Sequence, residues 1–260
     1  MSGLELNFES FNSVSPVTPL LILHGFFASA RNWRGLAKRF SEQRPVYVLD
    51  LRNHGSSPHD SQMDYPQLAE DVLAFLDRHH IIQADFLGHS MGGKVAMWLA
   101  LHQPERIRQL IIADISPVSY SHCFEHTISS LRALDLDTLS NRKQAEENLA
   151  EAIPDLSYRQ FLLQNLLLEQ GQYRWRVNLD YFQANAAYIV AFPDLSEGLV
   201  LQKPVLFLSG EQSYYIRPEA IFSLFPQAQI VELAGTGHWL HIDAPQDFLR
   251  LSEDWLNQAA

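Results

Sequence analysis

The segment ADFLGHSMGGKVAMWLALH at residues 84–102 constrains the fold of this chain more than any other. An apolar run of strand type ends in Gly-His-Ser-Met-Gly, and a helical segment follows at once. At such a turn the backbone of Ser90 is strained, and glycines at 88 and 92 avoid collisions with the neighbouring strand and helix. The turn lifts the serine hydroxyl to a helix N-terminus, where backbone N–H groups can stabilise an oxyanion. The segment therefore predicts a reactive serine on an α/β scaffold. The simpler alternative is a glycine-rich turn with an incidental serine.

Short apolar runs alternate with helical segments on both sides of this turn. Strand-like runs lie near the start (LELNF) and at 19–25, 46–55, 84–90, 107–114, 205–210 and 230–235, and helix-like segments lie at 65–79, 93–102 and 244–256. Strands that alternate with helices in this way predict an α/β fold, with a mostly parallel sheet covered by helices on both faces.

The alternation breaks between about Ser116 and Gln202, where helix signals dominate. The clearest are at 141–153 and at 157–170, and the second has Ser157 as a plausible cap and stops before a glycine. Residues 171–178 fit either a short hairpin or an extended link. We therefore expect residues 117–202 to form an all-helical insert, which interrupts an α/β core made of residues 1–116 and 203–260.

Charge and composition limit the partners of this chain. The formal net charge of −11 gives no basic footprint for nucleic acid, so we expect no such partner. Cys123 is the only cysteine, which excludes an internal disulfide and a CxxC redox motif. The N-terminal segment does not resemble a secretory signal, and no window approaches the ~20 apolar residues of a membrane span. We expect a cytoplasmic protein without membrane insertion.

The dipeptide His-Gly at 24–25 closes an early strand, where a second oxyanion donor belongs. The expected donors are the backbone N–H groups of Phe26 and Met91. The turn DLRNHGSSP at 50–58 is expected to support the site without taking part in the chemistry.

GTGHW at 235–239 places His238 on a loop after the last strand. This agrees with the chain order serine, acid, histidine that is typical of a reactive serine on such a scaffold. The acid is less simple. The turn after the penultimate strand reads GEQS, so Ser213 stands where an aspartate is common. Asp114, at the end of a strand, and Glu211, in the turn itself, are both candidates.

Together, the motifs HGFF, DLRNHGSSP, GHSMGGK, ADISP and GTGHW resemble the α/β-hydrolase superfamily and, more narrowly, the YbfF-type esterases, also described as acyl-CoA esterases. The resemblance implies one core with a small helical cap after the sixth strand, and hydrolysis of esters and thioesters. It favours Asp114 as the acid, because ADISP matches the acid motif of the family. It also implies that Ser213 supports the histidine.

The expected reaction is acyl transfer through Ser90, with His238 as base and Asp114 as its orienting acid. A small ester or an acyl-CoA is the expected partner, and no metal or cofactor is required. We expect Phe27, Phe161 and Leu162 to shape an apolar pocket for the acyl chain.

Other readings of the same residues stay open. The same triad serves carbon–carbon bond hydrolysis, perhydrolysis and lyase chemistry, and a ligand-binding protein could keep the fold. His122 and His126 have metal-pair spacing without an evident third ligand, so we expect a solvated face. Arg174 and Arg176 meet either solvent or a phosphate of coenzyme A.

Overall fold

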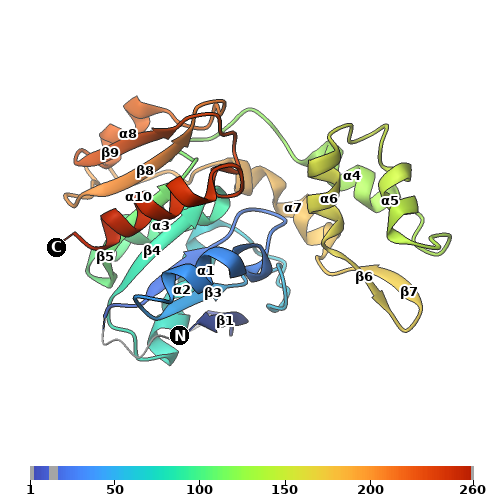
Figure 1. Cartoon of the computed structure of the whole chain (residues 1–260), viewed down its shortest axis with the longest axis horizontal. Helices are drawn as coiled ribbons and strands as arrows, with labels where there is room; N and C mark the ends of the chain where they lie inside the picture. Colours follow the sequence, from blue (N-terminus) through green and yellow to red (C-terminus); the bar gives the residue numbers. More distant parts are fainter. Residues whose placement is uncertain (1–2, 12–16, 259–260) are drawn as a thin grey trace.

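A seven-stranded sheet forms the centre of the molecule in a computed structural model that describes residues 3–11 and 17–258 (Figure 1). Its strands are β1 (Phe8–Phe11), β2 (Leu20–Leu23), β3 (Val46–Leu49), β4 (Ala84–His89), β5 (Ile107–Ala113), β8 (Val205–Gly210) and β9 (Ala228–Leu233). The spatial order is β1-β3-β2-β4-β5-β8-β9, and only β1 runs antiparallel to its neighbour. The α/β-hydrolase fold is thus confirmed, although the first strand lies at Phe8–Phe11 rather than at LELNF.

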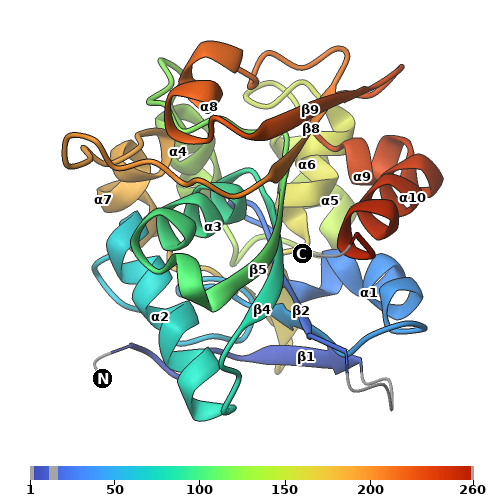
Figure 2. The same cartoon turned by 90° about the vertical axis from the view of Figure 1, so that its left-hand side faces the viewer.

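Helices cover both faces of this sheet (Figure 2). They are α1 (Arg34–Phe40), α2 (Tyr65–Arg78), α3 (Met91–His102), α8 (Pro218–Leu224), α9 (Leu240–Asp243) and α10 (Pro245–Leu256). Helices α1 and α10 pack on one face, and α2, α3 and α8 pack on the other. Strand β2 shows why its sequence is uniformly apolar, since Leu20 and Ile22 enter one core, Leu21 enters the other, and all are fully buried.

The chain between β5 and β8 forms an insert beside the sheet (Figure 1). It holds α4 (Glu125–Ala133), α5 (Arg142–Asn148), α6 (Leu156–Leu163), β6 (Leu166–Glu169), β7 (Gln172–Trp175) and α7 (Leu179–Val190). The insert follows the fifth strand of the described chain, not the sixth.

The expectation of an all-helical insert is wrong, because β6 and β7 pair as an antiparallel hairpin. Helix α6 begins after Asp155, whose carboxylate caps it in place of Ser157, and it ends at Leu163. The hairpin turns at Gln170 and Gly171, which have φ angles of 51° and 83°. Two positive φ angles in a two-residue loop are typical of a hairpin turn. Gly171 is therefore part of this turn and does not end a helix.

Several side chains join the insert to the core. On α7, Asn185 accepts the Met63 N–H at 3.0 Å, and the carbonyl of Ile189 accepts the Tyr65 hydroxyl at 2.6 Å. The ammonium of Lys94 on α3 donates to the carbonyls of Val190 and Ala191 at 2.8 and 2.7 Å. These bonds fix the C-terminal end of α7 beside α3, the helix that follows Ser90.

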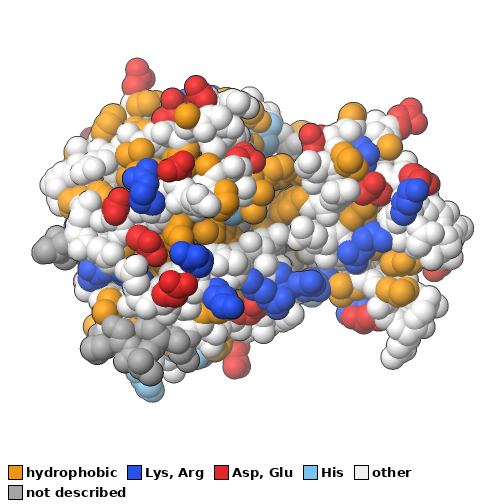
Figure 3. Space-filling model, in the orientation of Figure 1, with side chains coloured by type: hydrophobic (Ala, Val, Ile, Leu, Met, Phe, Trp, Pro, Cys, Tyr) orange, Lys and Arg blue, Asp and Glu red, His pale blue; other side chains and the backbone are white. Residues whose placement is uncertain are grey.

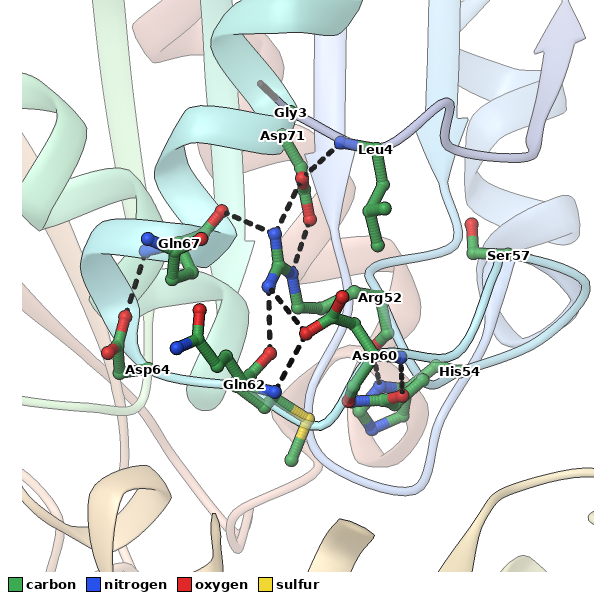
Figure 4. A network of polar contacts seen from close by, with 12 residues as sticks. Gly3, Leu4, Arg52, His54, Ser57, Asp60, Gln62, Asp64, Gln67 and Asp71 are labelled. Carbon is green, nitrogen blue, oxygen red and sulfur yellow. Dashed lines mark hydrogen bonds and ion pairs between the residues drawn. The ribbon is translucent and has the colours of Figure 1, made fainter.

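The turn after β3 is held by a buried ion pair (Figure 4). Arg52 donates to both carboxylate oxygens of Asp71 at 2.6 and 2.8 Å, and to the carbonyls of Gln62 and Gln67. Asp71 also accepts the Leu4 N–H at 2.7 Å. Burial raises the pKa of Asp71, which the guanidinium opposes. These contacts hold the turn in place.

No helix in the described ranges is long and apolar enough to span a membrane.

Candidate active site

Ser90 occupies the sharp turn between β4 and α3, with φ 52° and ψ −119°. Few side chains adopt this backbone conformation, so the surrounding structure must hold it. The glycines on either side leave the space that the turn needs. A Cβ at Gly88 would lie 2.4 Å from the carbonyl oxygen of Gly92, and one at Gly92 would lie 2.2 Å from that of Leu23. The crowding expected from the sequence is present.

His238 and Asp114 meet at the end of β5. The Nδ1–H of the histidine donates to Oδ2 of the carboxylate at 2.7 Å, which leaves Nε2 free to accept a proton. Asp114 is fully buried, and its Oδ1 accepts the Gly210 N–H at 3.0 Å. The structure therefore brings together the histidine and one of the two candidate acids.

The other candidate acid lies apart from the histidine. Glu211 accepts the Gly235 N–H at 2.6 Å and so braces its own loop. Ser213, two residues later, donates its hydroxyl to Oδ2 of Asp114 at 2.5 Å. Ser213 thus contacts the carboxylate, so any support it gives to the histidine passes through Asp114.

The two candidate oxyanion donors lie on either side of Ser90. Met91 is the first residue of α3, so its N–H has no partner within the helix. Phe26 lies in the turn that follows β2, where the Ala28 N–H donates to the Gly25 carbonyl at 3.1 Å. In the described part of the chain, neither the Phe26 nor the Met91 N–H donates to a backbone carbonyl. Both residues line the cavity that Ser90 lines.

Two buried histidines, His24 and His89, hold the backbone around the site, and His89 also lines the cavity. The Nδ1–H of His24 donates to the Gly25 carbonyl at 2.8 Å, and its Nε2 accepts the Leu51 N–H at 3.1 Å. The Nε2–H of His89 donates to the carbonyl of His238 at 2.8 Å. Burial lowers the pKa of His24, and it lowers that of His89 further, with nearby histidines adding to the effect.

A cavity of about 520 Å³ lies between the core and the insert, and both Ser90 and His238 line it. Eleven of the thirty residues that line it are phenylalanine, tyrosine or tryptophan. Phe27 and Phe161 line it as the sequence suggested, whereas Leu162 is fully buried in the apolar core and is not part of the wall. The expectation that Leu162 shapes the pocket is therefore wrong. Successive residues of a helix face different directions, so Leu162 points away from the wall to which Phe161 contributes.

Several residues at the cavity have no role predicted from the sequence. Tyr215 lies with its ring centroid 4.2 Å from that of His238, and Trp239 packs against Phe161 at 5.5 Å. Lys94 belongs to the GHSMGGK motif and lines the cavity wall, although only 1% of its surface is exposed. A lysine on an otherwise apolar helix was the available signal.

The metal alternative gains no support from the geometry. The ring of His126 is bonded to the carbonyl of Ala152 at 2.8 Å, while His122 packs edge-on against Phe124 and Tyr215. Within residues 3–11 and 17–258, no group of three histidine, cysteine or acidic side chains could hold a metal ion.

Known proteins resemble this chain over most of its length. Residues 18–245 match the family described as alpha/beta hydrolase fold. The chain is 37% identical to the sn-1-specific diacylglycerol lipase ABHD11 of Xenopus tropicalis, over 95% of this chain and 80% of that protein. It is 33% identical to esterase YbfF of Escherichia coli, over 92% and 93% of the two chains.

Among solved structures, the one described as a marine microorganism esterase superposes with a TM-score of 0.92. It is 34% identical, and the match covers 97% of this chain and all of that one. The chain therefore belongs to the α/β-hydrolase family, among the YbfF-type esterases, and is a hydrolase.

Proposed function

We propose that this protein is a serine hydrolase that cleaves carboxylic esters and acyl-CoA thioesters through Ser90, His238 and Asp114. The observation that carries the proposal is the hydrogen bond from His238, which lines the same cavity as Ser90, to the buried carboxylate of Asp114. This bond fixes the tautomer in which Nε2 can take the serine proton.

The proposed reaction has two halves. Ser90 attacks the acyl carbonyl, and His238 takes its proton and gives it to the leaving alcohol or thiol. Water then attacks the acyl-enzyme, giving a proton to His238, which returns it to Ser90 as the acid is released. The Phe26 and Met91 N–H groups stabilise the oxyanion in both halves.

An apolar acyl group suits the cavity. Phe27 and Phe161 contribute aromatic surface to its wall, and the volume of about 520 Å³ is within the range of small-molecule sites. The named activities of the relatives, an esterase and a lipase, support ester cleavage. We propose that residues 117–202 act as a cap that selects the acyl chain, since α6 brings Phe161 to the wall.

A phosphate-bearing leaving group, such as coenzyme A, is favoured by basic side chains near the junction of core and insert (Figure 3). Arg174 is paired with Glu169, whereas among the described residues neither Arg31 nor Arg176 forms an ion pair within 4 Å. The Nε of Arg176 is buried without a hydrogen-bond partner. Burial, and then the charge of Arg31, lower the pKa of Arg176, while Asp50 and Glu169 oppose this effect.

The backbones of both arginines adjoin residues near the cavity wall. Arg31 precedes Asn32, which lines the wall and donates to Gln164 of the insert at 2.8 Å. The Arg176 N–H donates to the carbonyl of Asn165 at 2.7 Å. An anion that binds both arginines would therefore lie close to the junction through which a long substrate passes.

Labelling with a fluorophosphonate tests the nucleophile. We expect one adduct, on Ser90, and a severe loss of labelling in His238→Ala. A panel of p-nitrophenyl esters and acyl-CoAs of rising length then measures reaction class and pocket depth. Adducts on other serines, or hydrolysis of a carbon–carbon bond with no ester turnover, would contradict the proposal.

The thioester half has its own test. Each acyl group is presented on coenzyme A and on N-acetylcysteamine, which lacks the phosphates. We expect Arg176→Ala to raise KM for the coenzyme A thioester roughly tenfold, because it loses a charged hydrogen bond of about 1.5 kcal/mol. KM for the N-acetylcysteamine thioester should not change. Arg174→Ala is the matched control because Glu169 already pairs with that side chain.

A further inference from the structure

The turn that carries the Phe26 N–H has an unfavourable backbone conformation. Phe27 has a φ of 63°, in the left-handed region that side chains rarely adopt. The turn is closed by one bond, from the Ala28 N–H to the Gly25 carbonyl. The direction of the Phe26 N–H depends on the conformation of this turn, so something outside it must hold that conformation.

One such contact comes from the insert. Asn165 lies between α6 and β6, and its side-chain Nδ2 donates to the Phe27 carbonyl at 2.8 Å. Its own backbone is fixed on both sides, because its N–H donates to the Leu162 carbonyl and its carbonyl accepts the Arg176 N–H. Asn165 is 4% exposed, so water competes little for this bond. The contact spans 138 residues of sequence.

We propose that Asn165 is a positioning residue for the oxyanion hole, and this inference rests on the proposed function. Its amide holds the Phe27 carbonyl, and so keeps the Phe26 N–H directed at the site where negative charge develops. The insert thus contributes to the rate of the chemical step as well as to the fit of the substrate. A displaced insert would loosen the turn and weaken the oxyanion site.

Asn165 could instead only join the insert to the core, and Asn185 provides a matched control for that role. Asn185 is also 4% exposed and also lies in the insert. It accepts the Met63 N–H at 3.0 Å and donates to the Ser61 carbonyl at 2.9 Å, so it joins insert and core through another loop. A purely structural effect would be shared by Asn165→Ala and Asn185→Ala.

The experiment measures kcat and KM on p-nitrophenyl acetate, together with inhibition by two matched ketones. A trifluoromethyl ketone forms a tetrahedral oxyanion with the serine, whereas the plain methyl ketone binds only as a ground-state mimic. Removing one oxyanion donor lowers kcat by ~10²–10³, so displacing a donor through Asn165→Ala should lower it roughly 10- to 100-fold. We expect KM and methyl ketone binding to stay constant, and trifluoromethyl ketone binding to weaken in parallel with kcat.

Asn165→Asp keeps the shape but removes the donor, and it provides the same test if the alanine variant does not fold. The inference is overturned if either Asn165 variant matches Asn185→Ala in kcat and in the ratio of the two ketone affinities. It is also overturned if KM rises while kcat is unchanged. Failure of the proposed function has a different result, since the wild-type protein would then neither turn over the ester nor bind the trifluoromethyl ketone.

Discussion

The carboxylate of Asp114 accepts the Nδ1–H of His238 at 2.7 Å, with the acid fully buried and the imidazole one-quarter exposed. The acid therefore has fixed surroundings, while the histidine reaches the cavity. The hydroxyl of Ser213 and the N–H of Gly210 also donate to this carboxylate. Three donors fix the orientation of this carboxylate, so that it faces the Nδ1–H of His238.

Replacing the acid tests this relationship. We expect Asp114→Asn to lower kcat by on the order of 10³ to 10⁴, because the histidine would adopt the wrong tautomer. Glu211→Gln should stay within roughly tenfold of wild type, since it loses only part of a contact to its own loop. Steady-state kinetics on one soluble ester, with circular dichroism as a folding check, measure both. A crippled Glu211→Gln beside a near-normal Asp114→Asn would show that the acid is misassigned.

Ser213→Ala removes one donor from the same carboxylate. The loss of one hydrogen bond of about 1–2 kcal/mol should lower kcat roughly 5- to 30-fold. KM should change little, because Ser213 bonds to Asp114 rather than to an acyl chain. A loss as large as that of Asp114→Asn would mean that the hydroxyl has a direct catalytic role.

The neighbours Phe161 and Leu162 separate pocket shape from stability. Phe161 lines the cavity, so Phe161→Ala should shift the preferred p-nitrophenyl ester to a longer chain and leave acetate turnover within about threefold. Leu162 is fully buried outside the wall, so Leu162→Ala should reduce the free energy of unfolding by about 2–5 kcal/mol. Its chain-length profile should not change. Urea unfolding and the ester panel measure the two effects, and a reversed pattern would place the pocket elsewhere.

Lys94 gives a pH dependence of stability. Burial lowers the pKa of this lysine to about 7, while the unfolded chain keeps a value near 10.5. Between these two values the unfolded chain binds a proton that the folded chain lacks, so wild-type stability should rise with pH relative to Lys94→Met. The difference in unfolding free energy should grow by up to about 1.4 kcal/mol per pH unit.

Urea unfolding of both proteins at pH 7 and pH 9.5 measures this change. Using the difference between the two proteins cancels the other groups that titrate in this range. A constant difference would mean that the carbonyls of Val190 and Ala191 keep the ammonium charged throughout, in spite of its burial.

Much of the fold follows from local pattern. The strands β2, β3, β4, β5, β8 and β9 lie within or beside the predicted apolar runs, because a strand buried on both faces needs a continuous apolar sequence. A short hairpin was one of two readings of residues 171–178, which contain β7, but its first strand, β6, was predicted as helix for a related reason. Leu166 to Leu168 continue the apolar character of α6, and periodicity does not separate a short buried strand from the end of a helix.

The site divides in the same way. Ser90 and His238 belong to motifs whose spacing carries chemical meaning, and the crowding at Gly88 and Gly92 follows from the turn itself. The choice between Asp114 and Glu211 needed the pairing of β5 with β8, which places Asp114 beside Gly210. The contact of Asn165 with Phe27 could not be predicted from the sequence, because it depends on how the insert packs on the core.

The bond between Gly210 and Asp114 joins residues that are 96 apart in sequence, and the insert fills that interval. Chain-closure entropy grows only with the logarithm of loop length. Closing this interval therefore disfavours folding by only about 2 kcal/mol more than a short crossover of roughly 12 residues would. The insert could therefore become longer or shorter during evolution while the acid and the histidine keep their positions. The residues of the chemistry and the segment that contributes to the cavity wall could then change independently of one another.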